Sequence, residues 1–155
     1  MSGTYASVKF SPQVGELLQL WCNCHGIPMT IIPEFLHCTV LYSRTEVEPI
    51  EIPLKKIYLS PKEFRIFDNG SERALVLLLD APELSELHDR LIEQGGTHDY
   101  PEYNPHVTLS FQVSENLNIN KFPVPPLIFV PSELCYEPLD PVWKHGVRTS
   151  NISEH

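Results

Sequence analysis

The sequence lacks any hydrophobic run long enough to cross a membrane. No apolar stretch approaches the ~18 residues that a membrane-spanning helix needs. The opening Met-Ser-Gly-Thr-Tyr also lacks the basic start and apolar segment of a secretory signal peptide. We therefore expect a cytoplasmic protein with no membrane partner.

Cysteines are few and irregularly spaced, which argues against a disulfide framework. They are Cys22, Cys24, Cys38 and Cys135, and thiols in the cytosol stay reduced. Cys22, Cys24 and His25 invite a metal-site interpretation. However, residues at i and i+2 lie on different faces of a helix, and no second ligand pair has a zinc-like spacing. We expect no metal and no other cofactor.

Basic residues are also scarce. The chain has 11 Lys and Arg against 20 Asp and Glu, a formal net charge of -9. A protein that binds duplex or long single-stranded nucleic acid needs a basic face to neutralise phosphates. The composition argues against that class of partner, whereas a small anionic ligand needs only a few local donors.

The residues that are present predict one loop-rich α+β domain over 1–155. Hydrophobic residues make up 42% of the 155 residues, enough for a sizeable core, and fifteen prolines lie mainly in connections. Strand patterns occur at 4–10, 35–42, 62–67, 73–80, 106–111 and 134–139, with further strands beginning at 55 and covering 128–130. Helical spacing predicts helices over 12–25, capped by Ser11, and over 81–94. In the second helix we expect Ile92 to face the core and His88 to be exposed.

A four-residue motif occurs twice, as His-Cys-Thr-Val at 37–40 and His-Val-Thr-Leu at 106–109. Successive side chains of a strand point to opposite faces. His37 and Thr39 therefore share a face, as do His106 and Thr108. The alternate residues of both strands are expected in the core; they are Cys38, Val40 and Tyr42, and Val107, Leu109 and Phe111.

The residues before the two motifs repeat as well. Pro33-Glu34-Phe35 precedes the first and Pro101-Glu102-Tyr103 the second, and a helical segment ending in glycine lies upstream of each. This repetition indicates a duplicated helix–loop–strand unit whose halves face each other about a pseudo-two-fold axis. Two histidines and two threonines would then surround one cleft.

Two imidazoles beside one anion suit acid–base cleavage of a phosphodiester. A neutral histidine can take a proton from the attacking hydroxyl while a protonated one gives a proton to the leaving oxygen. Threonine hydroxyls can donate hydrogen bonds to the other phosphate oxygens. The alternative is that both motifs are ordinary half-buried strand residues.

The paired motifs at His37-Thr39 and His106-Thr108 resemble those of the 2H phosphoesterase superfamily. Their spacing, the chain length and the Met-Ser-Gly-Thr-Tyr5 start are similar to its phage anti-CBASS nuclease branch. The resemblance implies a bilobal α+β fold with two pseudo-symmetric lobes of antiparallel strands and helices, and the active site between them. It also implies metal-independent cleavage of cyclic di- and trinucleotide signals of bacterial antiphage immunity, in the host cytoplasm.

The same resemblance places four residues at the bases of the substrate: Tyr5, Phe67, Glu137 and Trp143. From the sequence alone, Trp143 is equally a packing anchor or a stacking platform. Two other functions stay open. One is a cyclic phosphodiesterase or ligase acting on RNA ends, and the other is a sponge that binds a cyclic nucleotide without cutting it. The preferred bases, the oligomeric state and the division of acid and base roles are also open.

If Trp143 stacks on a base, Trp143→Ala should weaken binding without unfolding the protein. Stacking is indifferent to base identity, so affinity should fall by a similar factor for purine-only and mixed cyclic nucleotides. Glu137→Ala should instead affect some bases more than others. Titration in a His37→Ala background measures both. Unchanged affinity with a lower melting temperature would make Trp143 a packing anchor.

Overall fold

A six-stranded antiparallel sheet forms the centre of the computed structural model, which describes residues 3–99 and 102–139. The elements in chain order are β1 (Gly3–Lys9), α1 (Pro12–Cys24), β2 (His37–Ser43), β3 (Ser60–Asp68), β4 (Arg73–Asp80), α2 (Pro82–Glu93), β5 (His106–Ser110) and β6 (Glu133–Leu139). Short 3-10 turns cover Pro33–Phe35, Leu54–Lys56 and Ile119–Lys121. The α+β class and the main elements are as predicted, with ends that differ by at most two residues.

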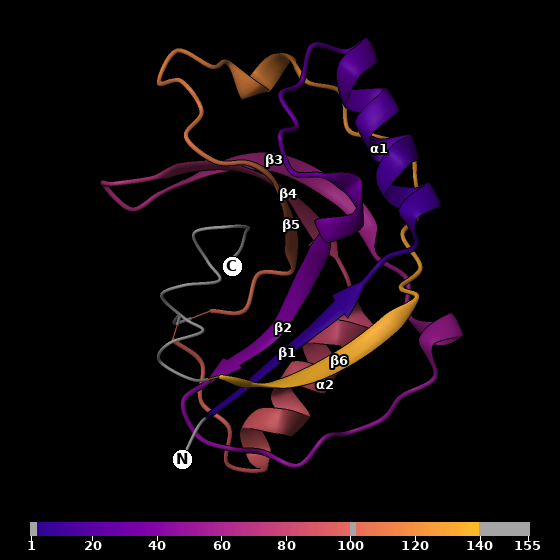
Figure 1. Cartoon of the computed structure of the whole chain (residues 1–155), viewed down its shortest axis with the longest axis vertical. Coiled ribbons are helices and arrows are strands. Elements are labelled where there is room, and N and C mark those ends of the chain that lie inside the picture. Colours follow the sequence, from indigo (N-terminus) through magenta and orange to yellow (C-terminus); the bar gives the residue numbers. More distant parts are fainter. Residues whose placement is uncertain (1–2, 100–101, 140–155) are drawn as a thin grey trace.

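The sheet consists of two three-stranded halves. Its order is β3-β4-β5-β2-β1-β6, so each motif strand is the inner strand of its half. Between β2 and β5 the ladder contains one residue pair, Cys38 opposite Val107. Figure 1 shows β2, β1 and β6 fanning out from β5, β4 and β3 at this junction. The motif strands therefore meet at the centre of the molecule, as the duplication predicts.

Both helices cover one face of the sheet. Leu18 of α1 and Leu84 of α2 belong to the same buried cluster as Val8, Cys38 and Val107. Because strand side chains alternate, the neighbours of these three strand residues lie on the other face. The core thus sits between sheet and helices. The motif side chains lie on the opposite face, which neither described helix covers and which we call the uncovered face.

A β-bulge follows each motif threonine. Val40 in β2 and Leu109 in β5 are skipped in the pairing with the neighbouring strand. An extra residue reverses the alternation of faces beyond it. Tyr42 and Phe111, which strict alternation placed in the core, instead pack on the uncovered face with separate small clusters. The predicted face was wrong for both residues because the sequence pattern does not reveal the bulges. The predicted burial of Tyr42 is confirmed, since only 8% of its surface is exposed.

Each bulge carbonyl finds a partner outside the ladder. Nδ1 of His88 lies 2.7 Å from the Val40 carbonyl oxygen, and the backbone N–H groups of Thr30 and Ile31 donate to the Leu109 carbonyl at 2.9 and 3.0 Å. A buried carbonyl without such a partner would be costly. The bulges are therefore supported by α2 on one side and by the segment before β2 on the other.

The predictions for two α2 residues were wrong. His88 is buried, with 7% of its surface exposed, whereas Ile92 is 36% exposed. The buried stripe runs through Leu84, His88 and Leu91, at the i, i+4 and i+7 positions of one helix face. His88 tolerates burial because its ring has the Val40 carbonyl as a partner.

Two expected strands are reduced to other structures. The segment at Lys55 and Lys56 belongs to a 3-10 turn, and Phe129 makes a single bridge to Leu59 instead of a strand over 128–130. Prolines on both sides of Phe129 lack the N–H that would extend a ladder. Ser11 occupies the cap position of α1, but its side chain makes no capping hydrogen bond.

Gly15 sets the distance between α1 and the turn that leads into β2. A Cβ atom at this position would lie 2.7 Å from the Pro33 carbonyl oxygen. We expect Gly15→Ala to lower the free energy of unfolding by about 1 kcal/mol, because overpacking of ~1–3 kcal/mol exceeds the gain in helix propensity. Urea unfolding measures this, with Gln13→Ala at an exposed position of α1 as control. A stabilised Gly15→Ala protein would show that the turn at Pro33 moves to accommodate the methyl group at little cost in free energy.

Candidate active site

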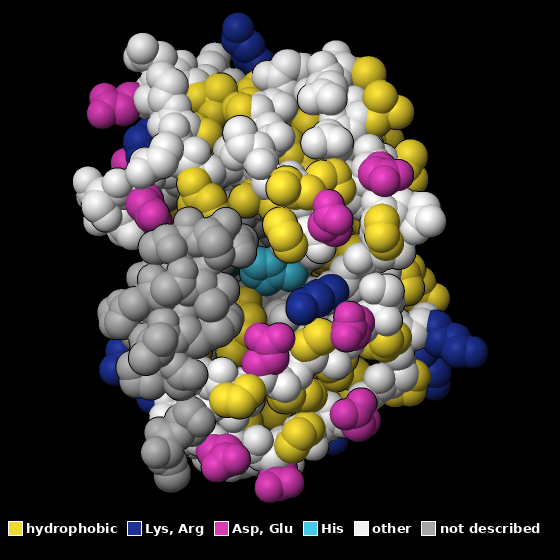
Figure 2. All heavy atoms as spheres, viewed as in Figure 1, with side chains coloured by type: hydrophobic (Ala, Val, Ile, Leu, Met, Phe, Trp, Pro, Cys, Tyr) yellow, Lys and Arg dark blue, Asp and Glu magenta, His cyan; other side chains and the backbone are white. Residues whose placement is uncertain are grey.

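The four motif side chains converge at the junction of the two halves. His37 and Thr39 flank Cys38, and His106 and Thr108 flank Val107, the pair that joins β2 to β5. Cys38 and Val107 are both fully buried in the core. Figure 2 shows histidine side chains in a recess at the centre of the uncovered face. The structure therefore brings together all four residues that the motifs singled out.

Both histidines are held by the same hydrogen bond. Nδ1 of His37 lies 2.9 Å from the carbonyl oxygen of Phe35, and Nδ1 of His106 lies 2.8 Å from that of Asn104. A carbonyl can only accept, so Nδ1 carries the hydrogen in both rings. The other ring nitrogen, Nε2, is then the one that can accept or deliver a proton. This arrangement fits a pair of acid–base groups.

The environment of His37 favours its neutral form. Burial lowers the pKa of His37 below its ordinary value, and the nearby charges of His106 and Lys9 lower it further, while the hydrogen bond to the Phe35 carbonyl raises it. Cys38, between the two motif residues of β2, is no rival nucleophile. Burial raises the pKa of its thiol to about 12, so the thiolate is scarce near neutrality.

Thr39 is fixed from two sides. Its hydroxyl oxygen lies 2.8 Å from that of Tyr5, and its carbonyl accepts a hydrogen bond of 2.7 Å from the hydroxyl of Tyr103. Burial holds the pKa of Tyr103 well above its ordinary value, so this phenol stays a donor. Thr108, the equivalent residue, is less buried than Thr39. Either threonine hydroxyl is able to donate to an anion in the recess.

The residues expected at the substrate bases occupy different places. Tyr5 is buried, 6% exposed, with its ring centroid 6.5 Å from that of His37. Phe67 lies in a T-shaped contact with His106, at a centroid distance of 4.9 Å. Glu137 is opposite Tyr5 on β6, on the outer side of the site. Trp143 lies outside the described residues. Contacts of all four with bases stay a prediction.

Three supporting features were missed from the sequence. They are the carbonyls of Phe35 and Asn104, the hydroxyl of Tyr103 and the ammonium of Lys9. The carbonyls occur two residues before each histidine, a repeat that the aligned motifs contain. Lys9 lies four residues after Tyr5 on β1, so the alternation of strand faces puts both side chains on the same face. The sequence could therefore have identified Lys9. Tyr103 has no such signal, because its partner is a backbone carbonyl of a distant strand.

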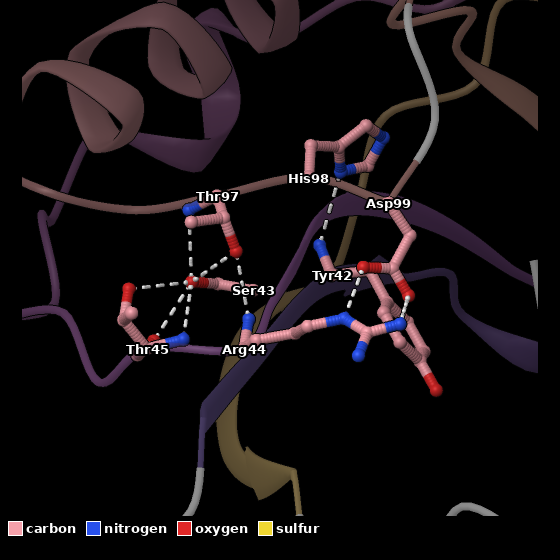
Figure 3. A network of polar contacts seen from close by, with 7 residues as sticks. All are labelled: Tyr42, Ser43, Arg44, Thr45, Thr97, His98 and Asp99. Carbon is pink, nitrogen blue, oxygen red and sulfur yellow. Dashed lines mark hydrogen bonds and ion pairs between the residues drawn. The ribbon is translucent and has the colours of Figure 1, made fainter.

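The segment before β5 runs along the edge of β2 beyond the bulge. The Tyr42 N–H donates to Nδ1 of His98 at 3.2 Å, and the Arg44 N–H donates to the Thr97 hydroxyl at 2.9 Å. Figure 3 shows this network, with the Arg44 guanidinium on Asp99. These side chains take the place of the strand partner that β2 lacks here.

His98 makes this network sensitive to acid. Burial first, and then the charge of His88, lower the pKa of His98 to about 4, with Asp99 acting in the opposite direction. His98 is therefore neutral in the folded protein at pH 6, and its Nδ1 can accept from Tyr42. A protonated His98 would lose that acceptor.

We expect the free energy of unfolding to fall as the pH drops from about 6.5 towards 4. In that window the unfolded chain binds a proton at His98 and the folded chain does not, so acid favours unfolding. His98→Asn keeps an acceptor near the Tyr42 N–H and should flatten this part of the profile. Urea unfolding at several pH values measures it, with His25→Asn at the exposed end of α1 as control. Equal slopes for wild type and His98→Asn would contradict the assignment.

Neither a metal-binding cluster nor a membrane-spanning helix is found among the described residues. No three His, Cys, Asp or Glu side chains there lie close enough together to hold a metal ion. No helix in the same ranges is long and apolar enough to cross a membrane.

Two solved structures have a similar fold. One described as a phosphoesterase aligns with a TM-score of 0.55 and 16% identity over 90% of this chain and 95% of its own. E. coli LigT complexed with 3'-AMP aligns with a TM-score of 0.54 and 15% identity, with the same coverage. At this identity the likeness concerns the fold, and it confirms the 2H phosphoesterase fold that the paired motifs predict.

Sequence relatives identify the family. The family described as Anti-CBASS protein Acb1 matches residues 2–146. Anti-CBASS protein Acb1 of Acinetobacter phage Ac42 is 33% identical over 142 residues, which cover 92% of this chain and 94% of the relative. The protein of the same name from Enterobacteria phage T4 is 30% identical over 112 residues, or 72% of this chain and 74% of the relative. The chain therefore belongs to the Acb1 family of anti-CBASS proteins.

Proposed function

We propose that this protein is a metal-independent phosphodiesterase that cleaves the 3',5'-linked cyclic di- and trinucleotide signals of CBASS immunity. The observation that carries this proposal is the matched pair of histidines, each held through Nδ1 by a carbonyl two residues upstream. A sponge has no need of two histidine rings held in the same tautomer. The family membership supports the same class of ligand.

The proposed reaction is an in-line attack within the substrate. The ribose 2'-oxygen bonds to phosphorus while its proton passes to one histidine Nε2. The bond from phosphorus to the 5'-oxygen breaks, and that oxygen takes a proton from the other histidine. The products are a 2',3'-cyclic phosphate and a 5'-hydroxyl, and water then opens the cyclic phosphate. Thr39 and Thr108 donate to the remaining phosphate oxygens, where negative charge develops.

The net charge of -9 fits a small substrate better than a long one. A cyclic oligonucleotide has few phosphates, so it needs only the donors of the recess. Aromatic residues pack in two clusters on the uncovered face, and two of them, Tyr5 and Phe67, have their rings beside the motif histidines. Each base stacked on an aromatic ring contributes ~1–3 kcal/mol. This supports recognition of the bases by stacking. We propose that Glu137 and Trp143 make further contacts with the bases.

A panel of substrates in EDTA tests the proposal. Cyclic di- and trinucleotides and an RNA ending in a 2',3'-cyclic phosphate are incubated with the protein, and product masses are measured. We expect linear products from the cyclic nucleotides with EDTA present. Activity lost in EDTA and restored by zinc or manganese would overturn metal independence. Cleavage of the RNA end alone would favour the RNA-end enzyme, and binding without products would favour a sponge.

Each motif histidine should be required for turnover. We expect His37→Ala and His106→Ala to lower the cleavage rate by at least ~10²-fold, the scale of a lost general acid or base, and to retain binding better than turnover. Thr39→Ala and Thr108→Ala should lose less, because each removes one hydrogen bond. His25→Ala at the exposed end of α1 serves as control. Near wild-type rates in either motif-histidine variant would refute the paired site.

A further inference from the structure

The two motifs are equivalent in the features that hold their histidines in place. Both histidines have the same tautomer, fixed by the same type of carbonyl, and both precede a bulged strand. Neither the motif nor the tautomer therefore distinguishes the group that accepts a proton from the group that donates one. The distinction has to come from the residues that surround the two rings.

The neighbouring strands supply different residues at equivalent positions. On β1, Lys9 lies opposite His37, and on β4, Leu78 lies opposite His106. β1 and β4 are the middle strands of the two halves, so these positions correspond under the pseudo-symmetry. Val8 points into the core, and Lys9 therefore shares the uncovered face with His37. Leu78 is 5% exposed and carries no charge.

Other charged and aromatic groups surround both histidines. On the His37 side, Glu133 lies beyond Lys9 in the same row, and the Glu137 carboxylate is 4.0 Å from the Lys9 ammonium. On the His106 side, Glu63 lies beyond Leu78 and forms an ion pair with Arg65. Tyr5 and Phe67 contact His37 and His106 through their rings. The ammonium is thus one strand from His37, and the carboxylates of Glu133 and Glu137 are one strand further away.

A cation beside an imidazole opposes its protonation. The charge of Lys9 lowers the pKa of His37 even though the Glu137 carboxylate lies 4.0 Å from the ammonium. The pKa of His37 is lowered by burial first and then by the charges of His106 and Lys9. The charge of Lys9 therefore adds to burial in keeping His37 neutral. Figure 2 shows a basic side chain directly beside the histidines of the recess.

We propose that Lys9 makes the paired site unequal, keeping His37 as the general base and leaving His106 as the general acid. This inference rests on the proposed function. His37 Nε2 takes the proton of the 2'-hydroxyl as the 2'-oxygen bonds to phosphorus. His106 Nε2 gives its proton to the departing 5'-oxygen. In the second step His106 takes a proton from water and His37 returns one to the 2'-oxygen. Lys9 acts through His37 and is a positioning residue.

A substrate that needs no acid tests the assignment of roles. The cyclic nucleotide that wild type cleaves best is prepared with sulfur in place of one 5'-bridging oxygen, and the released thiol is measured. A thiolate leaves without protonation, so His106→Ala should regain at least ~10-fold of its lost rate, a large part of a general-acid contribution. His37→Ala should stay inactive. Rescue of His37→Ala instead would overturn the assignment. Undiminished cleavage of the oxygen substrate by both variants would instead refute the proposed function.

The role of Lys9 is tested by the pH dependence of kcat/KM. The acidic limb reports the pKa of the base in the free enzyme. Lys9→Met removes the charge at similar length, so this limb should move to higher pH by about 0.5–1 unit. Lys9→Arg should leave it in place, and Lys55→Met, on an exposed turn, controls for net charge. An acidic limb unmoved in a folded Lys9→Met protein would exclude Lys9 from this role.

Discussion

The separation of β2 from β5 is the constraint on which the rest of the site depends. The two strands form one residue pair, Cys38 with Val107, and then diverge. A full ladder would extend side-chain pairing along both strands and place further residues where the recess lies. With one pair, the histidines and threonines on either side of it face a shared space. The same divergence leaves polar backbone groups on the inner edges of both strands, and these need other partners.

Those partners come from the segments that precede the motif strands, each of which bonds to the motif strand of the other half. The residues before β5 cover the edge of β2, where Tyr103, His98 and Thr97 bond to its backbone groups. The residues before β2 cover β5 in the same way, since Thr30 and Ile31 donate to the Leu109 carbonyl. Each connection therefore positions the histidine that follows it and also supports the other half. This reciprocity explains why the repeated sequence extends upstream of the motifs.

A symmetric backbone and an asymmetric set of neighbouring charges coexist in this site. The two motifs have the same backbone arrangement, the same Nδ1 hydrogen bond and the same bulge. Acid–base cleavage of a phosphodiester needs one histidine ring neutral and the other protonated. If the two halves of the site were identical, only the substrate could make the two rings different. Lys9 and Leu78, at corresponding positions of β1 and β4, provide a difference in charge before any substrate binds.

The sequence by itself determined the α+β class, the main elements and the four motif residues, because strand periodicity and an internal repeat are local signals. It also determined that each histidine shares a face with its threonine. It could not place Tyr42 and Phe111, because a bulge changes the alternation without changing the composition of the strand. It could not place His88, Tyr103 or His98, because their partners are carbonyls and N–H groups of strands distant in sequence. Tertiary structure decided those contacts, since the bulge in β2 and the divergence of β2 from β5 leave those groups in need of side-chain partners.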